Sequence, residues 1–240
     1  MNLTIVIPVY NEEKRIKNAV DALNTHLPSF KDITVNVIFV NDGSTDQTVN
    51  VINSLDKDFN SEIISYATNQ GKGYALKTGF LQAAGDYVLL MDADMSTPFE
   101  ELTKFLPEIK NNTPVIIGSR KTAGANVLKH QKPWRQKLGE GFTLLSNLLL
   151  VLNISDFTCG FKVFRQDAAH KIFKTQQIKR WGYDSEIIFL ANKFGFSIKE
   201  IPVVWTNDER SRVNLFKDVF RSFWDLIQLR YNDLTGKYEG

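Results

Sequence analysis

Residues 87–94 read YVLLMDAD, an apolar run of strand length that ends in Asp92 and Asp94. We expect a buried strand here, with both aspartates at its carboxyl end. Side chains two residues apart in an extended chain point to the same side, so the two carboxylates can face one point. In open α/β sheets, the carboxyl ends of the strands are where ligands bind.

The expected occupant of this point is a divalent cation, Mg²⁺ or Mn²⁺, that carries a phosphate-bearing substrate. Mg²⁺ is usually held by one or two carboxylates together with substrate oxygens. The alternative is an acidic turn without a ligand, in which Asp94 or Ser96 caps the helix that begins near Pro98. The neighbouring parts of the sequence are needed to choose between a metal site and an acidic turn.

The composition is that of a globular protein. The chain has 240 residues, with 43% hydrophobic and 23% charged residues, which suits one α/β domain. A net charge of +2 does not indicate a nucleic-acid partner, and nothing in the sequence indicates an oligomeric state. The single cysteine, Cys159, excludes an internal disulfide and is expected in the core.

No stretch reaches the ~20 apolar residues needed to span a bilayer. The nearest, residues 142–154, is too short and contains Ser146 and two asparagines. The N-terminus lacks the basic region of a signal peptide. We therefore expect a cytoplasmic protein whose membrane contact is peripheral.

Strands and helices alternate along the chain. Strands are expected at residues 3–9, 35–40, 63–66, 87–91, 115–119 and 198–204. Helices are expected from residues 11–13 onward and at 45–55, 74–84, 98–110, 135–152, 183–194 and 214–231. This order predicts βαβ crossovers and a mostly parallel sheet in an α/β fold. The basic segment 122–137 reads as structureless, and no linker divides the chain, so we expect one domain.

Residues 69–73, NQGKG, place two glycines and Lys72 before a helix. Free N–H groups and the helix dipole favour a phosphate at such a position. The pattern of a P-loop is absent, which disfavours an ATPase. The alternative is a glycine turn with a solvated lysine.

Residues 41–46, NDGSTD, follow the strand at 35–40. Asp46 can cap the next helix. Asp42, at the carboxyl end of the strand, can accept hydrogen bonds from a nucleobase or a ribose. The two roles are compatible.

Five stretches in this order resemble the family 2 glycosyltransferases of the GT-A fold, which use nucleotide-diphospho-sugars. They are IPVYNEE at 7–13, NDGSTD at 41–46, NQGKG at 69–73, DAD at 92–94 and GSR at 118–120. The resemblance implies a Rossmann-like GT-A fold. It assigns residues 1–120 to the nucleotide-sugar and residues 121–240, with an amphipathic C-terminal helix, to the acceptor.

The resemblance also implies site residues. Asp92 and Asp94, with Ala93 between them, are expected to bind the metal and the diphosphate. Lys72 is expected to bind on the nucleotide side. The rest of the expected nucleotide-sugar site comprises Pro8, Tyr10, Asn11, Glu12, Asp42 and Arg212.

The second half narrows the resemblance to one branch. Residues 156–162 (DFTCGFK), 180–186 (RWGYDSE) and 200–205 (EIPVVW) look like the dolichyl-phosphate glucosyltransferases, which are related to the dolichyl-phosphate mannose synthases. This implies an inverting transfer of a hexose, glucose from UDP-glucose, to a polyprenyl phosphate. GDP-mannose stays open as the donor.

The sequence departs from the family pattern at two places. Ser96 stands where many relatives carry glutamine, which leaves phosphates and water to complete the metal shell. Residues 210–212 read RSR instead of the usual Gly-Ser-Lys. Arg212 can still bind phosphate, whereas Arg210 changes the backbone conformations allowed there.

Three residues are expected on the catalytic, acceptor side. Arg120 and then Arg135 can grip the acceptor phosphate, because a guanidinium fork matches its geometry. Asp156 is expected near the acceptor as an orienter or a base, and its alternative role is a turn residue. Asp184 and Glu186 either line the acceptor side or simply favour the start of a helix.

The C-terminal helix carries an apolar stripe. Core packing is its ordinary explanation. The alternative is that part of the stripe, with Lys217, Arg221 and Arg230, lies at an anionic membrane surface. The stripe comprises Leu215, Phe216, Val219, Phe220, Phe223, Trp224 and Ile227.

Other functions remain as alternatives. A transfer to a sugar hydroxyl requires a firm general base. A catalytically silent protein would bind a nucleotide-sugar without turnover. A dinucleotide-binding oxidoreductase is disfavoured, because no Gly-x-Gly-x-x-Gly follows the first strand.

Overall fold

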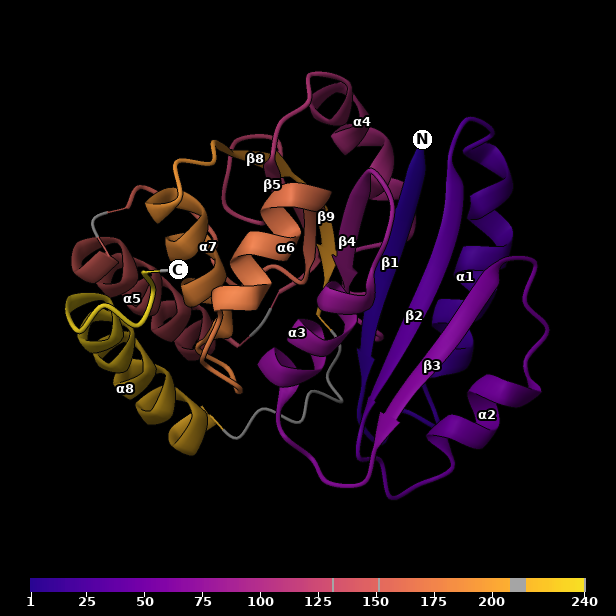
Figure 1. The fold of residues 1–240 in the computed structure, drawn as a ribbon, viewed down its shortest axis with the longest axis horizontal. Helices are drawn as coiled ribbons and strands as arrows, with labels where there is room; N and C mark the ends of the chain where they lie inside the picture. Colours follow the sequence, from indigo (N-terminus) through magenta and orange to yellow (C-terminus); the bar gives the residue numbers. More distant parts are fainter. Residues whose placement is uncertain (131, 151, 208–214, 240) are drawn as a thin grey trace.

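A computed structural model describes residues 1–130, 132–150, 152–207 and 215–239, without the side chains of residue 135 and of residues 215–220. Its centre is a seven-stranded sheet with the order β3-β2-β1-β4-β7-β5-β8 (Figure 1). β7 runs antiparallel to β4 and β5, and the other pairs run parallel. The strands are β1 (Asn2–Val9), β2 (Thr34–Asp42), β3 (Asn60–Tyr66), β4 (Tyr87–Met91), β5 (Val115–Ser119), β7 (Phe161–Arg165) and β8 (Ile198–Pro202).

Helices cover both faces of the sheet, so its central strands are apolar on both sides. Along β1, Val6 enters one core, whereas Ile5 and Ile7 enter the other, as alternation along a strand requires. The first core is covered by α3 (Lys72–Gln82), α6 (Gln166–Thr175) and α7 (Tyr183–Lys193). The second is covered by α1 (Ile16–His26), α2 (Thr48–Ser54) and α4 (Leu102–Lys110). Short 3₁₀ helices, η1 (Leu27–Ser29) and η2 (Phe99–Glu101), precede β2 and α4.

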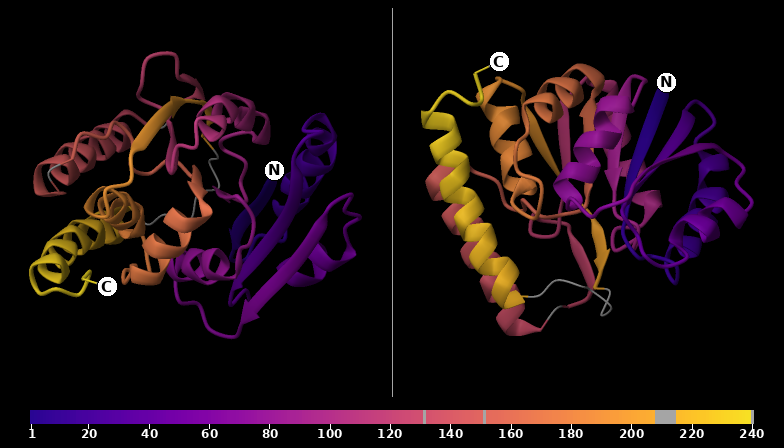
Figure 2. Two further views of the ribbon diagram at one scale, coloured as in Figure 1. Left: turned by 45° about the horizontal axis from the view of Figure 1, so that its top comes forward. Right: turned by 60° about the horizontal axis from the view of Figure 1, so that its bottom comes forward.

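Two further pairs of elements lie beside this sandwich. β6 (Asn126–Lys129) and β9 (Val204–Thr206) form a small parallel ribbon. The two longest helices, α5 (Pro133–Leu150) and α8 (Leu215–Leu234), lie side by side at the end of the molecule away from β3 (Figure 2). Within the described residues, no helix is both long enough and apolar enough to cross a membrane.

The expected α/β fold and its mostly parallel sheet are confirmed, with local corrections. The antiparallel strand β7 was not expected, and the strand expected at 198–204 ends at Pro202, because β9 pairs with β6 instead. The segment 122–137 is not structureless, because it contains β6 and the start of α5. The region after β7 forms α6, which was not expected although its buried positions recur at helical spacing. The helix expected from residues 11–13 begins at Ile16, because the chain first makes a turn.

Candidate active site

The structure corrects how Asp92 and Asp94 come together. β4 ends at Met91, so the two aspartates do not lie on an extended strand. They lie in a turn, in which the Met95 N–H donates to the Asp92 carbonyl (3.2 Å) and the Ser96 N–H to the Asp94 carboxylate (2.9 Å). Met95 has a φ of 55°, which is uncommon for a residue other than glycine. Burial and the negative charge of Asp92 raise the pKa of Asp94, so the two carboxylates interact.

Lys72, at the start of α3, reaches these carboxylates. Its Nζ lies 2.7 Å from Asp92 Oδ1 and 5.7 Å from the centre of the Tyr183 ring. Burial alone lowers the pKa of Lys72, but the charge of Asp92, with Tyr183 and Asp184, outweighs it and raises the pKa well above its usual value. The lysine is therefore charged and paired, and the alternative of a solvated lysine does not describe it.

The antiparallel strand β7 brings a glycine against Asp92. Met91 of β4 pairs with Phe161 of β7, and the Asp92 N–H donates to the Gly160 carbonyl (3.2 Å). A Cβ at Gly160 would lie 2.0 Å from Asp92 Oδ2. The Asp92 carboxylate thus needs a glycine at this position.

The residues around Asp92 and Asp94 fit a divalent cation that is shared with a substrate. Among the described residues, no group of three or more histidine, cysteine, aspartate or glutamate side chains could hold a metal ion. Asp94, whose charge is disfavoured by burial and by the neighbouring Asp92, suits an ion that is completed by phosphate oxygens and water. Neither Asp94 nor Ser96 caps the next helix, since Pro98 is the residue before η2.

The ends of β1 and β2 are tied together beside this pair. The Asn11 N–H donates to Ser44 Oγ (2.9 Å), and Asn11 Oδ1 accepts from the Thr45 N–H (2.7 Å). Asn11 has a φ of 55°, and such outliers tend to occur at functional sites. Tyr10 is exposed and Pro8 half-buried, so both are accessible to a ligand.

Glu12 and Asp42 are already engaged by the protein. The carboxylate of Glu12 pairs with Arg15. Asp42 is buried and accepts hydrogen bonds from the N–H groups of Gln70 (2.7 Å) and Gly71 (2.9 Å). It therefore fixes the turn that carries Lys72, and a contact between Asp42 and a nucleoside stays a prediction.

Arg120 and Asp156 form a two-pronged ion pair. Arg120 Nε and Nη2 lie 2.6 and 2.7 Å from the two oxygens of Asp156, and the Arg120 N–H donates to the same carboxylate (3.0 Å). Nη2 also donates to Thr158 Oγ1 (2.7 Å), and the guanidinium lies 5.2 Å from the centre of the Trp205 ring. The guanidinium is thus held in one orientation.

Asp156 is poorly suited to accept a proton near neutral pH. Its side chain is 1% exposed. Burial alone raises the pKa of Asp156, but the charge and hydrogen bonds of Arg120 outweigh it and lower the pKa to about 2. Glu200 fixes the same loop by accepting the N–H groups of Ser155 and Asp156.

The remaining predicted residues fall into three groups. Ala93 is buried between the two aspartates. Arg212 and the side chain of Arg135 lie outside the described residues. Asp184 pairs with the buried Lys162 (2.5 Å), and Glu186 is fully buried, so neither lines an open surface.

Cys159 lies in the core as expected, with burial raising the pKa of its thiol to about 11. The sequence did not single out Gly160, Tyr183, Thr158 or Trp205. Each lies in a stretch that carried the resemblance in the second half, but their partners are distant in the sequence. Only the pairing of β7 with β4 brings Gly160 to Asp92.

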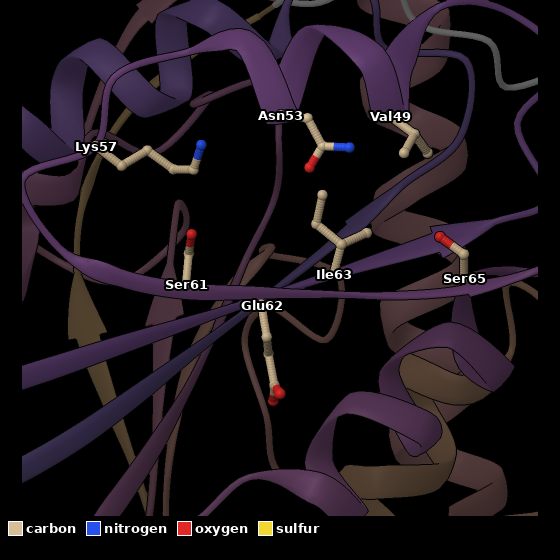
Figure 3. A pocket seen from close by; sticks show the side chains of 7 residues that line it. All are labelled: Val49, Asn53, Lys57, Ser61, Glu62, Ile63 and Ser65. Carbon is tan, nitrogen blue, oxygen red and sulfur yellow. The ribbon is translucent and has the colours of Figure 1, made fainter.

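A hollow of about 570 Å³ lies away from these residues, between α2 and β3 (Figure 3). It is lined by Val49, Asn53, Lys57, Ser61, Glu62, Ile63 and Ser65. It contains no acid–base or metal-binding cluster, so the chemistry is better placed at the ends of β1, β4 and β5.

Known proteins are similar to this chain in sequence or in fold. The family model described as glycosyl transferase family 2 matches residues 4–173. A dolichyl-phosphate beta-glucosyltransferase of Trichomonas vaginalis is 34% identical over 99% of this chain and 75% of its own. The dolichyl-phosphate beta-glucosyltransferase of Homo sapiens is 34% identical over 98% of this chain and 77% of its own.

A solved structure of glucosyl-3-phosphoglycerate synthase from Mycobacterium tuberculosis, in complex with Mn²⁺, UDP and glucosyl-3-phosphoglycerate, shares the fold. Its TM-score is 0.69 at 17% identity, over 95% of this chain and 79% of that one. The order of the five stretches, the mostly parallel sheet and these likenesses agree with one another. The chain belongs to glycosyl transferase family 2, in the branch of the dolichyl-phosphate beta-glucosyltransferases.

Proposed function

We propose that this chain is an inverting hexosyltransferase that moves glucose from UDP-glucose to a polyprenyl phosphate of the dolichyl type. The observation that carries the proposal is the likeness to dolichyl-phosphate beta-glucosyltransferases along 98–99% of the chain. An oxygen of the acceptor phosphate attacks the anomeric carbon of the sugar. The bond to the diphosphate breaks, and UDP leaves with its electron pair.

The donor side is built on Asp92, Asp94 and Lys72. Mn²⁺, or Mg²⁺ in its place, bound at the two aspartates would neutralise the charge that develops on the leaving diphosphate. The related synthase complex contains Mn²⁺ with UDP, which supports a divalent ion of this kind. Lys72 is charged and adjoins Asp92, so it adds a positive charge on the same side. In this proposal Pro8, Tyr10, Asn11, Glu12 and Asp42 bind the nucleoside.

The acceptor side is built on Arg120. A guanidinium that is held by Asp156 and by the Trp205 ring is oriented before a ligand arrives. Such a group suits a phosphate, and the neighbouring Thr158 hydroxyl can also bind the same phosphate.

The low pKa of Asp156 and its ion pair with Arg120 favour a phosphate acceptor over a sugar hydroxyl. A phosphate monoester is already anionic near neutral pH, so it needs little help from a base. A hydroxyl acceptor needs a general base, and Asp156 has a pKa of about 2 and is already paired. We therefore assign Asp156 the role of holding Arg120.

We further propose a peripheral contact with the cytoplasmic face of a membrane through α5 and α8. One side of α8 packs in the core, where Leu226 and Leu229 are buried. The other side is apolar and exposed, and Lys137 and Arg221 are exposed on the same two helices. Such a surface suits an anionic bilayer that supplies a lipid substrate. Its exposed apolar residues are Trp134, Leu138, Leu144, Leu148, Phe223, Trp224, Ile227, Tyr231 and Leu234.

The test is a transfer assay that compares donors. The protein is incubated with Mn²⁺ or Mg²⁺, a short polyprenyl phosphate and either UDP-glucose or GDP-mannose, and the extracted lipid is weighed by mass spectrometry. We expect the lipid to gain one hexose with UDP-glucose. A gain with GDP-mannose alone would overturn the choice of donor, and no gain with either would overturn the lipid-phosphate acceptor.

A further inference from the structure

A buried carboxylate joins two parts of the chain that are distant in the sequence. Glu186, in the first turn of α7, is fully buried. Its Oε1 and Oε2 accept hydrogen bonds from the N–H groups of Gln177 (2.9 Å) and Ile178 (2.8 Å). Oε1 also accepts from the hydroxyl of Tyr238 (2.6 Å), a fully buried residue that follows α8. These three hydrogen bonds link the carboxylate to one loop and to one tyrosine.

The loop that Glu186 holds, residues 176–182, packs on the turn that carries Lys72. The Tyr74 N–H donates to the Lys179 carbonyl (3.0 Å), and Gln176 Nε2 donates to the Gly73 carbonyl (3.1 Å). A Cβ at Gly73 would lie 2.5 Å from the Ile178 carbonyl oxygen. Loop 176–182 and the Lys72 turn are therefore in direct backbone contact, and one cannot shift without the other.

α8 fixes the other end of the same loop. Asp225 of α8 accepts the N–H of Gly182 (3.0 Å). A Cβ at Gly182 would lie 2.3 Å from the Asp225 Cβ, so the helix approaches the loop closely. Loop 176–182 is thus held at one end by Tyr238 through Glu186 and at the other by Asp225.

We propose that Tyr238 is a positioning residue for the donor site. Its hydroxyl fixes the Glu186 carboxylate, the carboxylate fixes loop 176–182, and the loop fixes the turn from which Lys72 reaches Asp92. The link to the donor rests on the proposed function, in which Lys72 serves the donor side. The Arg120 and Asp156 pair lies outside this chain of contacts, so Tyr238 acts on the donor and not on the acceptor.

The first test removes only the hydroxyl, with Tyr238→Phe. We expect the KM for UDP-glucose to rise about tenfold, the size that follows from losing one hydrogen bond to a buried charged group. The KM for the polyprenyl phosphate should stay within about twofold, because its site is not linked to Tyr238. The matched control is Tyr87→Phe, which removes the hydroxyl that a buried tyrosine at the start of β4 donates to the Ile109 and Thr113 carbonyls, and which should change neither KM. Equal rises in both KM values, or no rise, would overturn the proposal.

A double-mutant cycle tests whether Tyr238 acts through Glu186. Glu186→Gln should raise the KM for UDP-glucose, and adding Tyr238→Phe should raise it little further, because residues in one hydrogen-bonded network do not act additively. Two independent and multiplying effects would contradict the proposed route.

Hydrogen exchange separates this proposal from the proposed function, because it needs no substrate. In Tyr238→Phe, the amides of residues 74, 177 and 178 should exchange faster, while those of β1 should not change. The affinity for UDP, measured by calorimetry, is a second readout that needs no acceptor, and it should fall in Tyr238→Phe. If the wild type transfers no glucose but the amides and the UDP affinity change as expected, the proposed function fails and the positioning role stands. Unchanged exchange at residues 74, 177 and 178 would overturn the positioning role whatever the activity.

Discussion

At the scale of single residues, the buried pair of Arg120 and Asp156 makes stability depend on pH. The pKa of Asp156 is lowered to about 2 in the folded protein, against about 3.9 in an unfolded chain. Its stabilising contribution is therefore complete above pH ~5 and is lost as the pH falls toward 2, and it amounts to about 2.6 kcal/mol. Asp156→Asn lacks this contribution.

Urea unfolding of both proteins at pH 7 and at pH 3 measures this prediction. The wild type should lose more free energy of unfolding between the two values than Asp156→Asn does. A gap between the two proteins that stays constant over this range would show that Asp156 is not the titrating group.

Asp94 should be needed for activity, although it lowers the stability of the metal-free protein. Burial and the charge of Asp92 raise the pKa of Asp94, so its ionised form is disfavoured in the folded protein without a metal. Asp94→Asn should therefore raise the melting temperature of the metal-free protein at neutral pH, where the aspartate is ionised in the unfolded chain. Transfer should fall at least about a hundredfold, as for the loss of a group that stabilises developing charge. Calorimetry measures the melting temperature, and the lipid assay measures the transfer. Retained transfer would refute the assignment of Asp94 as a metal ligand.

At the scale of elements, the pairing of β7 with β4 makes Gly160 essential to the position of Asp92. Gly160→Ala places a Cβ 2.0 Å from Asp92 Oδ2, so the carboxylate has to move. A displacement of about 1 Å is expected to reduce kcat/KM about a hundredfold. The control is Gly139→Ala in α5, where a Cβ meets nothing within 4 Å. That change should preserve activity and stabilise the helix slightly. Equal activity of the two variants would show that Asp92 tolerates the displacement.

The strands and helices of the first half could be predicted from the sequence, because apolar runs and turn residues are local signals. The turn at Asp92 could not, since it depends on the Gly160 carbonyl and on the positive φ of Met95. β6 could not be predicted either, because it is only four residues long and pairs with β9, which is distant in the sequence. α6 did carry a local signal, since Ala168, Ala169, Ile172 and Phe173 recur at helical spacing.

In the candidate site too, local features could be predicted from the sequence, whereas contacts between distant residues could not. The sequence placed Asp92 and Asp94 together at the end of one strand and Lys72 before a helix, and in the structure Lys72 pairs with Asp92. The main partners of Asp42 and Asp156 could not be predicted, because Asn69 lies 27 positions from Asp42 and Arg120 lies 36 positions from Asp156. The assignment of residues 1–120 to the donor and 121–240 to the acceptor stays a prediction. Gly160 and Tyr183, which adjoin the donor carboxylates and Lys72, come from the second half.

At the scale of the whole molecule, the paired helices α5 and α8 predict binding to anionic vesicles. Trp224, 66% exposed on α8, is the test position. Trp224→Glu replaces a large apolar group with a negative charge, so the fraction bound to vesicles that contain phosphatidylserine should fall several-fold. Leu81→Glu, at an exposed leucine of α3, is the control and should bind like the wild type. Flotation measures the bound fraction, and the absence of wild-type binding would rule out this surface as a membrane contact.

The most direct measurement for the whole molecule compares acceptors with UDP-glucose as the donor. A short polyprenyl phosphate, the matching polyprenol and a glucoside are offered separately with Mn²⁺, and the products are weighed by mass spectrometry. Because Asp156 is paired with Arg120 and has a pKa of about 2, it is not free to act as a base, and we predict a glucosylated product from the polyprenyl phosphate alone. Glucose transferred to the polyprenol or to the glucoside, with none on the phosphate, would contradict the account.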